Sequence, residues 1–429
     1  MLIHAVIVLM GLVALGIPIA AALGWLALSL NFTFSSSPLY LALGDIAWQN
    51  STEFLLVAIP MFVLLGEILL RSGIASKMYE GMVQWLGWLP GGLMHSNIGA
   101  CSLFAATSGS SVATAATIGT VALPEVNKRK YNERLFLGTL AAGGTLGILI
   151  PPSINLILYG LLTDTSVPEL YLAGFLPGML LAGLFMLTVI IACTFKKSWG
   201  GTKVEVTWSS RIASLPGLVP PLGIFVVVVG SIYAGLATPT EAASLGVVAA
   251  MALAAANKSL TIEMLKGAIE GTMRTTAMIM LIILAAIFLN FILATIGLTQ
   301  ALTQFIISLG LSPFETMLMI IGFLILLGCF METLSMLLTT APLLAPIIIQ
   351  LGYDPVWFGI LLMVLLETAL ITPPIGINLY VVQGIRKSGR LNDVMIGTLP
   401  FVLTMFVMIG MLLAFPQIAL WLPELVYSR

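Results

Sequence analysis

The residues best suited to binding chemistry lie where long apolar stretches are interrupted by polar side chains. Hydroxyl groups crowd residues 107–111, and a double proline at 151–152 is followed by Ser153 and Asn155. Proline cannot donate to the helical hydrogen-bond ladder, so two in a row free several preceding carbonyls. In lipid these carbonyls must be satisfied unless they line a polar cavity. Carbonyls and hydroxyls together form an oxygen cage, which suits a hard cation such as Na⁺.

The same features return in the second half of the chain. Glu332 and Thr333 interrupt one apolar stretch, and Thr372 precedes a second double proline at 373–374, with Asn378 beyond it. A half-helix that begins after such a break carries partial positive charge at its N-terminus and can hold a carboxylate. A plainer interpretation is that prolines kink helices and serines cap them locally. Four breaks at corresponding positions favour a binding site.

The composition places the whole chain in a lipid bilayer. Of its 429 residues, 59% are hydrophobic and only 8% are charged, and the mean hydropathy is +1.12. A soluble domain carries about 25% charged residues, so we predict an all-α polytopic membrane protein. The net charge of −1 argues against nucleic acid as a partner. Two histidines and three widely spaced cysteines offer no metal-binding pattern.

Apolar length predicts the membrane crossings, because a spanning helix needs roughly 20 apolar residues. The first stretch is too long for a signal peptide and is predicted to be a retained helix. The candidate crossings are 4–30, 54–71, 134–163, 171–195, 213–236, 239–257, 275–296, 355–384 and 394–421. Two further stretches, 92–126 and 313–350, carry a polar break in the middle and are predicted to be re-entrant hairpins.

The basic residues support this map. If both hairpins enter and leave on one side, 16 of the 17 lysines and arginines, Lys203 and Lys387 among them, fall on a single face. Only Arg429 falls opposite. Because basic residues mark the cytoplasmic side, we predict a cytoplasmic N-terminus and an external C-terminus.

The two halves of the chain match at a nearly constant offset. The double proline at 151–152 matches that at 373–374, and Asn155 matches Asn378 once a single insertion after the prolines is allowed. The predicted map places five crossings between the matched regions, an odd number, so the repeats are inverted. Inverted repeats with broken helices are typical of secondary transporters. The predicted segments are an N-terminal scaffold helix and external loop (1–53), a first repeat (54–195), a connector with two scaffold helices (196–274), and a second repeat with the C-terminal helix (275–429).

Four acidic residues lie in apolar segments, where ionisable groups are by default functional. Glu332 and Glu367 adjoin the breaks and are the better candidates, whereas Glu67 and Glu241 fit a structural role equally well. The stretch 259–273 is predicted to be an amphipathic connector at the cytoplasmic interface, which lets one half move relative to the other. A plain linker helix is the alternative.

Several strings together carry a family resemblance over nearly the whole chain. They are Ser108-Gly109-Ser110-Ser111, residues 147–153, residues 238–243, and Pro373-Pro374-Ile375-Gly376-Ile377-Asn378. In this order they resemble the large membrane subunit of TRAP (tripartite ATP-independent periplasmic) transporters. The resemblance implies an ion-transporter-type fold that works as an elevator driven by Na⁺. It also implies two partners: a small four-helix membrane subunit on a separate chain, and a periplasmic substrate-binding protein.

The resemblance also assigns roles to residues of this sequence. A first Na⁺ site would use Ser108, Ser110, Ser111 and the backbone around Gly147 and Pro151. A second would use Thr333 and the backbone around Thr372 and Pro373. The organic-anion substrate, a carboxylate, sugar acid or sulfonate, would lie between the tips, near Ser111, Ser153, Asn155, Asn378 and Glu332. The second tip matches the family pattern less closely than the first.

Other functions remain alternatives at this point. A stand-alone carrier of the same superfamily, coupled to Na⁺ or to protons through Glu332, differs in needing no binding protein. An intramembrane enzyme would need a nucleophile and base or a metal site, and neither a His-Glu-x-x-His nor a Gly-x-Ser-x-Gly pattern occurs. A channel is disfavoured, because hairpins from opposite faces predict alternating access. We therefore expect a transporter rather than an enzyme.

Overall fold

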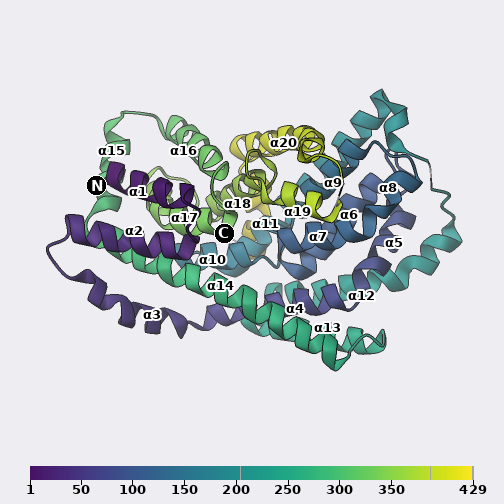
Figure 1. Cartoon of the computed structure of the whole chain (residues 1–429), viewed down its shortest axis with the longest axis horizontal. Helices are drawn as coiled ribbons and strands as arrows, with labels where there is room; N and C mark the ends of the chain where they lie inside the picture. Colours follow the sequence, from purple (N-terminus) through teal and green to yellow (C-terminus); the bar gives the residue numbers. More distant parts are fainter. Residues whose placement is uncertain (203, 387, 428–429) are drawn as a thin grey trace.

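A computed structural model describes residues 1–202, 204–386 and 388–427, and within these ranges the regular secondary structure is helical (Figure 1). The predictions for Lys203, Lys387 and Arg429 lie outside the described residues. Seven of the described helices are long and apolar enough to cross a membrane, and further apolar helices are shorter. The prediction of a multi-pass all-α chain is confirmed at this level.

One group of helices packs into a layer along the lower edge of Figure 1. It consists of α2 (Ile19–Phe34), α4 (Ala58–Arg71), α12 (Trp208–Tyr233), α13 (Pro239–Ala256) and α14 (Ile262–Thr295). We call these the scaffold helices. With 34 residues, α14 is about 51 Å long at 1.5 Å per residue, well beyond the roughly 30 Å of a bilayer core.

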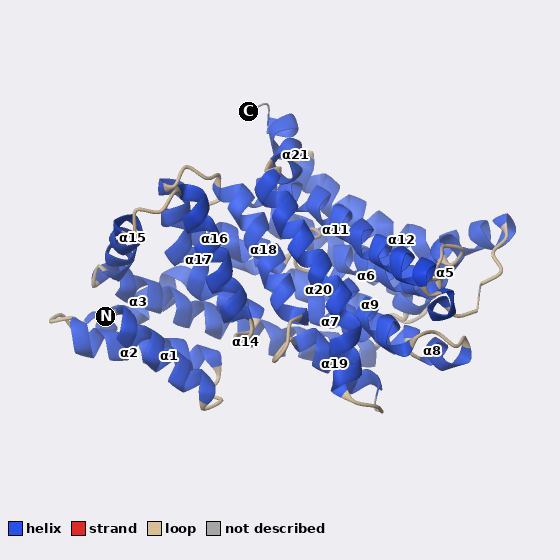
Figure 2. Cartoon of the chain, turned by 90° about the horizontal axis from the view of Figure 1, so that it is seen from above, coloured by secondary structure: helices blue, strands red, loops and turns tan. Residues whose placement is uncertain are grey.

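A second group contains the predicted hairpins and broken helices, and we call it the tip domain. From the first half come α6 (Leu93–Ser108), α7 (Ser111–Ala122), α9 (Glu133–Thr145) and α10 (Ile154–Thr163). From the second half come α16 (Pro313–Gly328), α17 (Thr333–Gln350), α18 (Pro355–Ile371) and α19 (Ile377–Arg386). The halves interlock, because α10 packs on α17 and α19 packs on α7. Figure 2 shows α7, α19 and α20 (Leu391–Ala414) close together.

Helix starts in the tip domain keep the offset seen in the sequence. The start of α7 at Ser111 corresponds to that of α17 at Thr333, and α10 and α19 correspond after the single insertion. The caps correspond as well. Asn132 accepts a hydrogen bond from the backbone at the start of α9, and Asp354 does so at the matching start of α18. Matching caps fix matching helix ends, because they satisfy N–H groups that the first turn leaves free.

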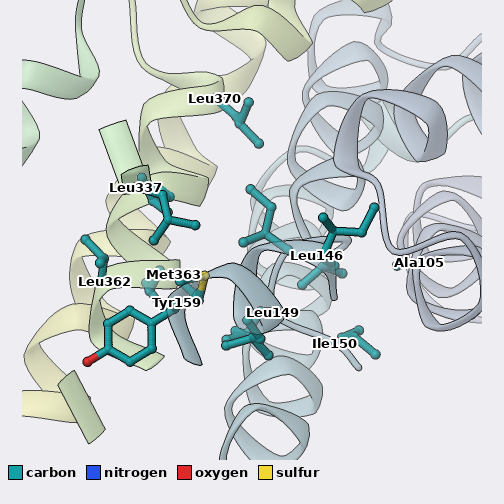
Figure 3. Packing of buried hydrophobic residues seen from close by; sticks show 14 of the residues in the cluster. Ala105, Leu146, Leu149, Ile150, Tyr159, Leu337, Leu362, Met363 and Leu370 are labelled. Atoms are coloured by element: carbon teal, nitrogen blue, oxygen red, sulfur yellow. The ribbon is translucent and has the colours of Figure 1, made fainter. Parts of the chain in front are cut away.

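The apolar core joins the two halves. Figure 3 shows Leu146, Leu149 and Ile150, from the first break, in one cluster with Leu337 and Leu362 from α17 and α18. All five side chains are buried. Burial of this kind supplies close van der Waals packing, which is the main attraction between helices within a membrane.

One predicted crossing is wrong, and another, 394–421, forms a span that ends earlier than predicted. The stretch 4–30 forms two helices, α1 (Leu2–Ala14) and α2, because Gly16 takes a positive φ of 71° and Pro18 has no N–H to continue the ladder. The His4 and Phe34 rings lie 5.3 Å apart, so α1 folds back along α2. A cytoplasmic N-terminus required a single crossing here and no longer follows. At the other end, α20 stops at Ala414 before Pro416, and α21 (Gln417–Tyr427) is separate.

The predicted connector at 259–273 is also not a separate element, because it forms the start of the continuous helix α14. Two glycines of this segment, Gly267 and Gly271, lie where α14 packs against α4. A Cβ at Gly271 would collide with the Glu67 carboxyl, and one at Gly267 with the Arg71 guanidinium. The segment therefore packs against α4 and continues without a break into the membrane-length part of α14.

Other helices extend or add to the predicted map. The predicted crossing 171–195 is contained in α11 (Val167–Phe195), which begins slightly earlier. Several shorter helices were not predicted. They are α3 (Leu43–Ser51), α5 (Ile74–Leu86), α8 (Pro124–Lys128) and α15 (Leu298–Ser308).

The close contact between α9 and α20 predicts a sharp substitution effect. A Cβ on Gly397 of α20 would overlap the backbone carbonyl of Arg134 on α9. Backbone cannot yield as a flexible side chain does, so we expect Gly397→Ala to cost about 1–3 kcal/mol or more and to lower the thermal unfolding midpoint in detergent. Gly410→Ala, on the same helix with open space around it, is the control and should leave the midpoint unchanged or slightly raised. Equal midpoints for the two variants would contradict the packing.

Candidate functional site

A cavity of about 460 Å³ lies between the tip domain and the scaffold helices. Its size falls within the usual range for small-molecule sites. Half of the twelve residues predicted for binding line it, from both halves of the chain. These are Ser108, Ser110, Ser111, Asn155, Glu332 and Thr333. The two polar tips, far apart in the sequence, therefore share one site.

The first tip is a tight turn held against the first break. Gly109 takes a φ of 61° between α6 and α7, and Ser110 caps α7 by accepting from the Ala113 N–H. The Ser111 hydroxyl donates to the Thr145 carbonyl at the end of α9, at 3.0 Å. A Cβ on Gly147 would lie within 2.7–2.9 Å of the Ser110–Ser111 backbone. The chain brings tip and break together here, as the first predicted ion site requires.

The first break is sealed from solvent. Residues 146–160 are all buried, Pro151 among them, and the Pro152 carbonyl lies close to Gly109 in the tip. Ser108 and Thr114 hydroxyls lie 3.2 Å apart across the turn. The first tip and break thus concentrate several oxygens in a small volume.

The second tip and break are arranged differently. Glu332 caps α17 through Oε2, which accepts from both the backbone N–H and the hydroxyl of Ser335. Thr333 lines the cavity, but Thr372 does not, and its hydroxyl donates to Thr368 within its own helix. Pro373 is only half-buried, and the two residues after it are exposed. The second predicted ion site is therefore less assembled than the first.

Two predicted substrate residues lie outside the cavity lining. Ser153 is fully buried and caps α10 at the Leu156 N–H. Asn378 is also fully buried, and its Nδ2 donates to the Ala141 carbonyl, at 3.1 Å. It joins α19 to α9, so its contacts in this structure are between the halves rather than with a ligand. Only Asn155 of the two matched asparagines faces the cavity.

The opposite wall was missed in the sequence. It comes from α4 and α14 of the scaffold, through Gly66, Glu67, Thr275 and Met278. Glu67 stood out as an acid in an apolar segment but was not placed at the site. Its carboxylate accepts from Arg71 Nε at 3.0 Å, one turn along α4. The signal available in the sequence was the i, i+4 spacing of Glu67 and Arg71, which predicts an ion pair along one face of the helix.

The other two acids have distinct environments. Glu241 caps α13, because it accepts from the Thr238 backbone and hydroxyl. Glu367 lies in α18, fully buried beside the Leu149 backbone in the first break. Neither of its oxygens makes a hydrogen bond of good geometry with a described residue. Glu367 therefore adjoins the first break but does not line the cavity.

In the part of the chain that the structure describes, seven membrane-length helices and a cavity at two polar tips have the organisation of a multi-pass membrane transporter. Comparison with known proteins identifies the family. The model for "Tripartite ATP-independent periplasmic transporter, DctM component" matches residues 6–418. The chain belongs to this family of TRAP transporter large permease proteins.

Individual relatives agree over nearly the full length. The chain is 34% identical to the C4-dicarboxylate TRAP transporter large permease DctM of Rhodobacter capsulatus, covering 97% of each protein. It is 31% identical to the sialic acid TRAP transporter large permease SiaM of Vibrio cholerae, again over 97% of each. A solved structure, the Alcanivorax borkumensis YdaH transporter, is similar in fold with a TM-score of 0.57 and 17% identity, over 88% of this chain and 90% of that one.

The contact between Gly147 and the first tip predicts a local effect. Gly147→Ala should push the Ser110–Ser111 backbone outward, because the new methyl group meets backbone at under 3.0 Å. We expect faster amide hydrogen exchange in peptides that cover 106–114, measured by mass spectrometry. Gly322→Ala on α16, which has open space around it, should leave that exchange unchanged. Unchanged exchange in the Gly147 variant would show that the tip does not rest on the break.

Proposed function

We propose that this chain is the membrane subunit that imports a small organic anion across the bacterial inner membrane by Na⁺ symport. A periplasmic binding protein delivers the substrate, and a small four-helix subunit on a separate chain completes the membrane part. The tripartite family description and the names of the relatives support this. Both relatives are named for carboxylate-bearing substrates, C4-dicarboxylates and sialic acid.

The single observation that carries the proposal is the shared cavity. It gathers both polar tips against α4 and α14, where one ligand can contact the tip domain and the scaffold at once. A substrate bound there moves together with the tip domain and is released when that domain shifts along the scaffold helices. This geometry is what an elevator mechanism requires.

Oxygen chemistry at the first tip supports Na⁺ as the coupling ion. A hydroxyl that donates to a carbonyl keeps its lone pairs for another partner. The Ser111 hydroxyl donates to Thr145 in this way, so its lone pairs remain available to a cation beside the Ser110 and Gly147 backbone. Residues in this first set are the better candidates for the ion site, because Thr333 and Thr372 of the second set are not brought together.

Loop contacts support the proposed orientation of the two repeats. Segments predicted to be cytoplasmic touch one another: Arg134 pairs with Asp393 at 3.0 Å, and Lys77 donates to Asn257 at 2.6 Å. Segments predicted to be external also meet, since Tyr159 in the helix before Asp164 donates to the Pro355 carbonyl. Such pairing is expected if the repeats are inverted across the membrane.

The central prediction concerns Na⁺ dependence. In proteoliposomes that hold the chain and its small subunit, with binding protein and labelled candidate organic anions outside, uptake should require an inward Na⁺ gradient. We expect Ser110→Ala to raise the Na⁺ concentration for half-maximal uptake about tenfold, the effect of losing roughly 1.4 kcal/mol of ion binding.

A matched control separates ion binding from helix capping, because Ser110 also caps α7. Ser312→Ala removes the equivalent cap from α16, away from the cavity, and should leave Na⁺ dependence unchanged. Uptake that needs no binding protein, or that follows a proton gradient alone, would favour the stand-alone carrier instead. A shift of the same size in both variants would assign Ser110 to capping only.

A further inference from the structure

We propose that the substrate of this permease carries an ammonium group beside its anionic group, and that Glu332 binds the ammonium. The inference rests on the proposed function and deepens it, because it narrows the substrate from any small organic anion to an amino acid or amino sulfonate. Three observations carry it: the charge in the cavity, the unused oxygen of Glu332, and the unpartnered amide of Asn155.

The cavity carries an acidic charge that nothing in its wall neutralises. Among the described residues that line it, the ionisable side chains are Glu67 and Glu332, with no lysine, arginine or histidine. Arg71 balances Glu67 through their ion pair. No described basic side chain pairs with Glu332. A purely anionic ligand would meet this charge inside the cavity, where contact between like charges is unfavourable.

Helix capping does not account for the charge of Glu332. The residue at the matching position of the first tip, Ser110, caps α7 with a neutral hydroxyl, and serine is among the preferred capping residues. Both capping hydrogen bonds of Glu332 use Oε2. Oε1 therefore has no hydrogen-bond partner among the described residues, in a side chain that lines the cavity. It is placed to accept from a ligand.

The Asn155 amide supplies the complementary group. Its side chain is 7% exposed and lines the cavity, and Nδ2 has no partner among the described residues. Buried amide donors are rarely left unpaired in folded proteins, so an acceptor on the ligand is expected. A carboxylate or sulfonate provides one, and the N-terminus of α7 beside it favours the same negative charge. The cavity thus has a binding group for an anion at Asn155 and the start of α7, and a binding group for a cation at Glu332.

The test compares matched ligand pairs on the full-length chain in lipid nanodiscs. The pairs are succinate with aspartate, in which an ammonium group replaces a hydrogen, and isethionate with taurine, in which it replaces a hydroxyl. Thermal unfolding is followed against ligand concentration in NaCl and in choline chloride. In NaCl we expect the amino member of at least one pair to bind about tenfold more tightly or better, the usual effect of a charge-assisted hydrogen bond. An equal response to both members of each pair, including no response, overturns the inference.

Variants assign the effect to its residue. Glu332→Gln keeps an oxygen that can cap α17 but removes the charge, so it should abolish the preference for the amino member while binding of the plain anion holds or improves. Glu332→Asp should retain part of the preference. Glu315→Gln, at an exposed acid that caps α16, should keep all of it. An equal loss for both members in Glu332→Gln, with a higher Na⁺ requirement, would assign Glu332 to the coupling ion and overturn the inference.

The same experiment keeps the two proposals apart. If the plain anions stabilise the chain only in NaCl and no amino preference appears, Na⁺ coupling stands and the ammonium-binding role of Glu332 fails. If the amino members bind more tightly than the plain anions, and do so equally well in choline chloride and in NaCl, the ammonium-binding role of Glu332 stands and Na⁺ coupling fails.

Discussion

The structure depends on the need to satisfy backbone groups wherever a helix stops inside an apolar environment. Each break in this chain frees carbonyls and N–H groups that lipid cannot hydrogen-bond. The chain meets this need by placing breaks against tips, as when Ser111 donates to Thr145 and Gly147 admits the Ser110 backbone. Polar groups of the tips and breaks therefore lie close together inside the protein, where they form a candidate binding site.

That constraint also explains why the two halves interlock. A single hairpin or half-helix is too short to bury its own ends, so α10 lies on the hairpin of the other half and α19 does likewise. Apolar side chains such as Leu149 and Leu337 fill the space between them (Figure 3). The polar tips are left facing the scaffold, where α4 and α14 close the cavity.

The two related halves of the chain differ at their tips and breaks, and these differences bear on function. Two related halves would provide two equivalent walls, yet the first break is sealed while the second is partly open. Where one tip has Ser110, the other has Glu332, and only one of the paired asparagines reaches the cavity. A repeated architecture can thus bind an unsymmetrical ligand, because its two ends meet chemically different tips.

Much of the architecture is determined by the sequence alone, because local physics controls it. Apolar length marks membrane helices, the double prolines mark breaks, and the offset between the two halves reappears in the helix starts. The split at Gly16 was within reach of the same reasoning, since Gly and Pro lie close together there. Only the tertiary structure decided that Asn155, not Asn378, faces the cavity, and that Glu67 and Thr275 form its far wall. Which side of a helix faces a site depends on how distant helices pack around it, and local sequence does not encode that rotation.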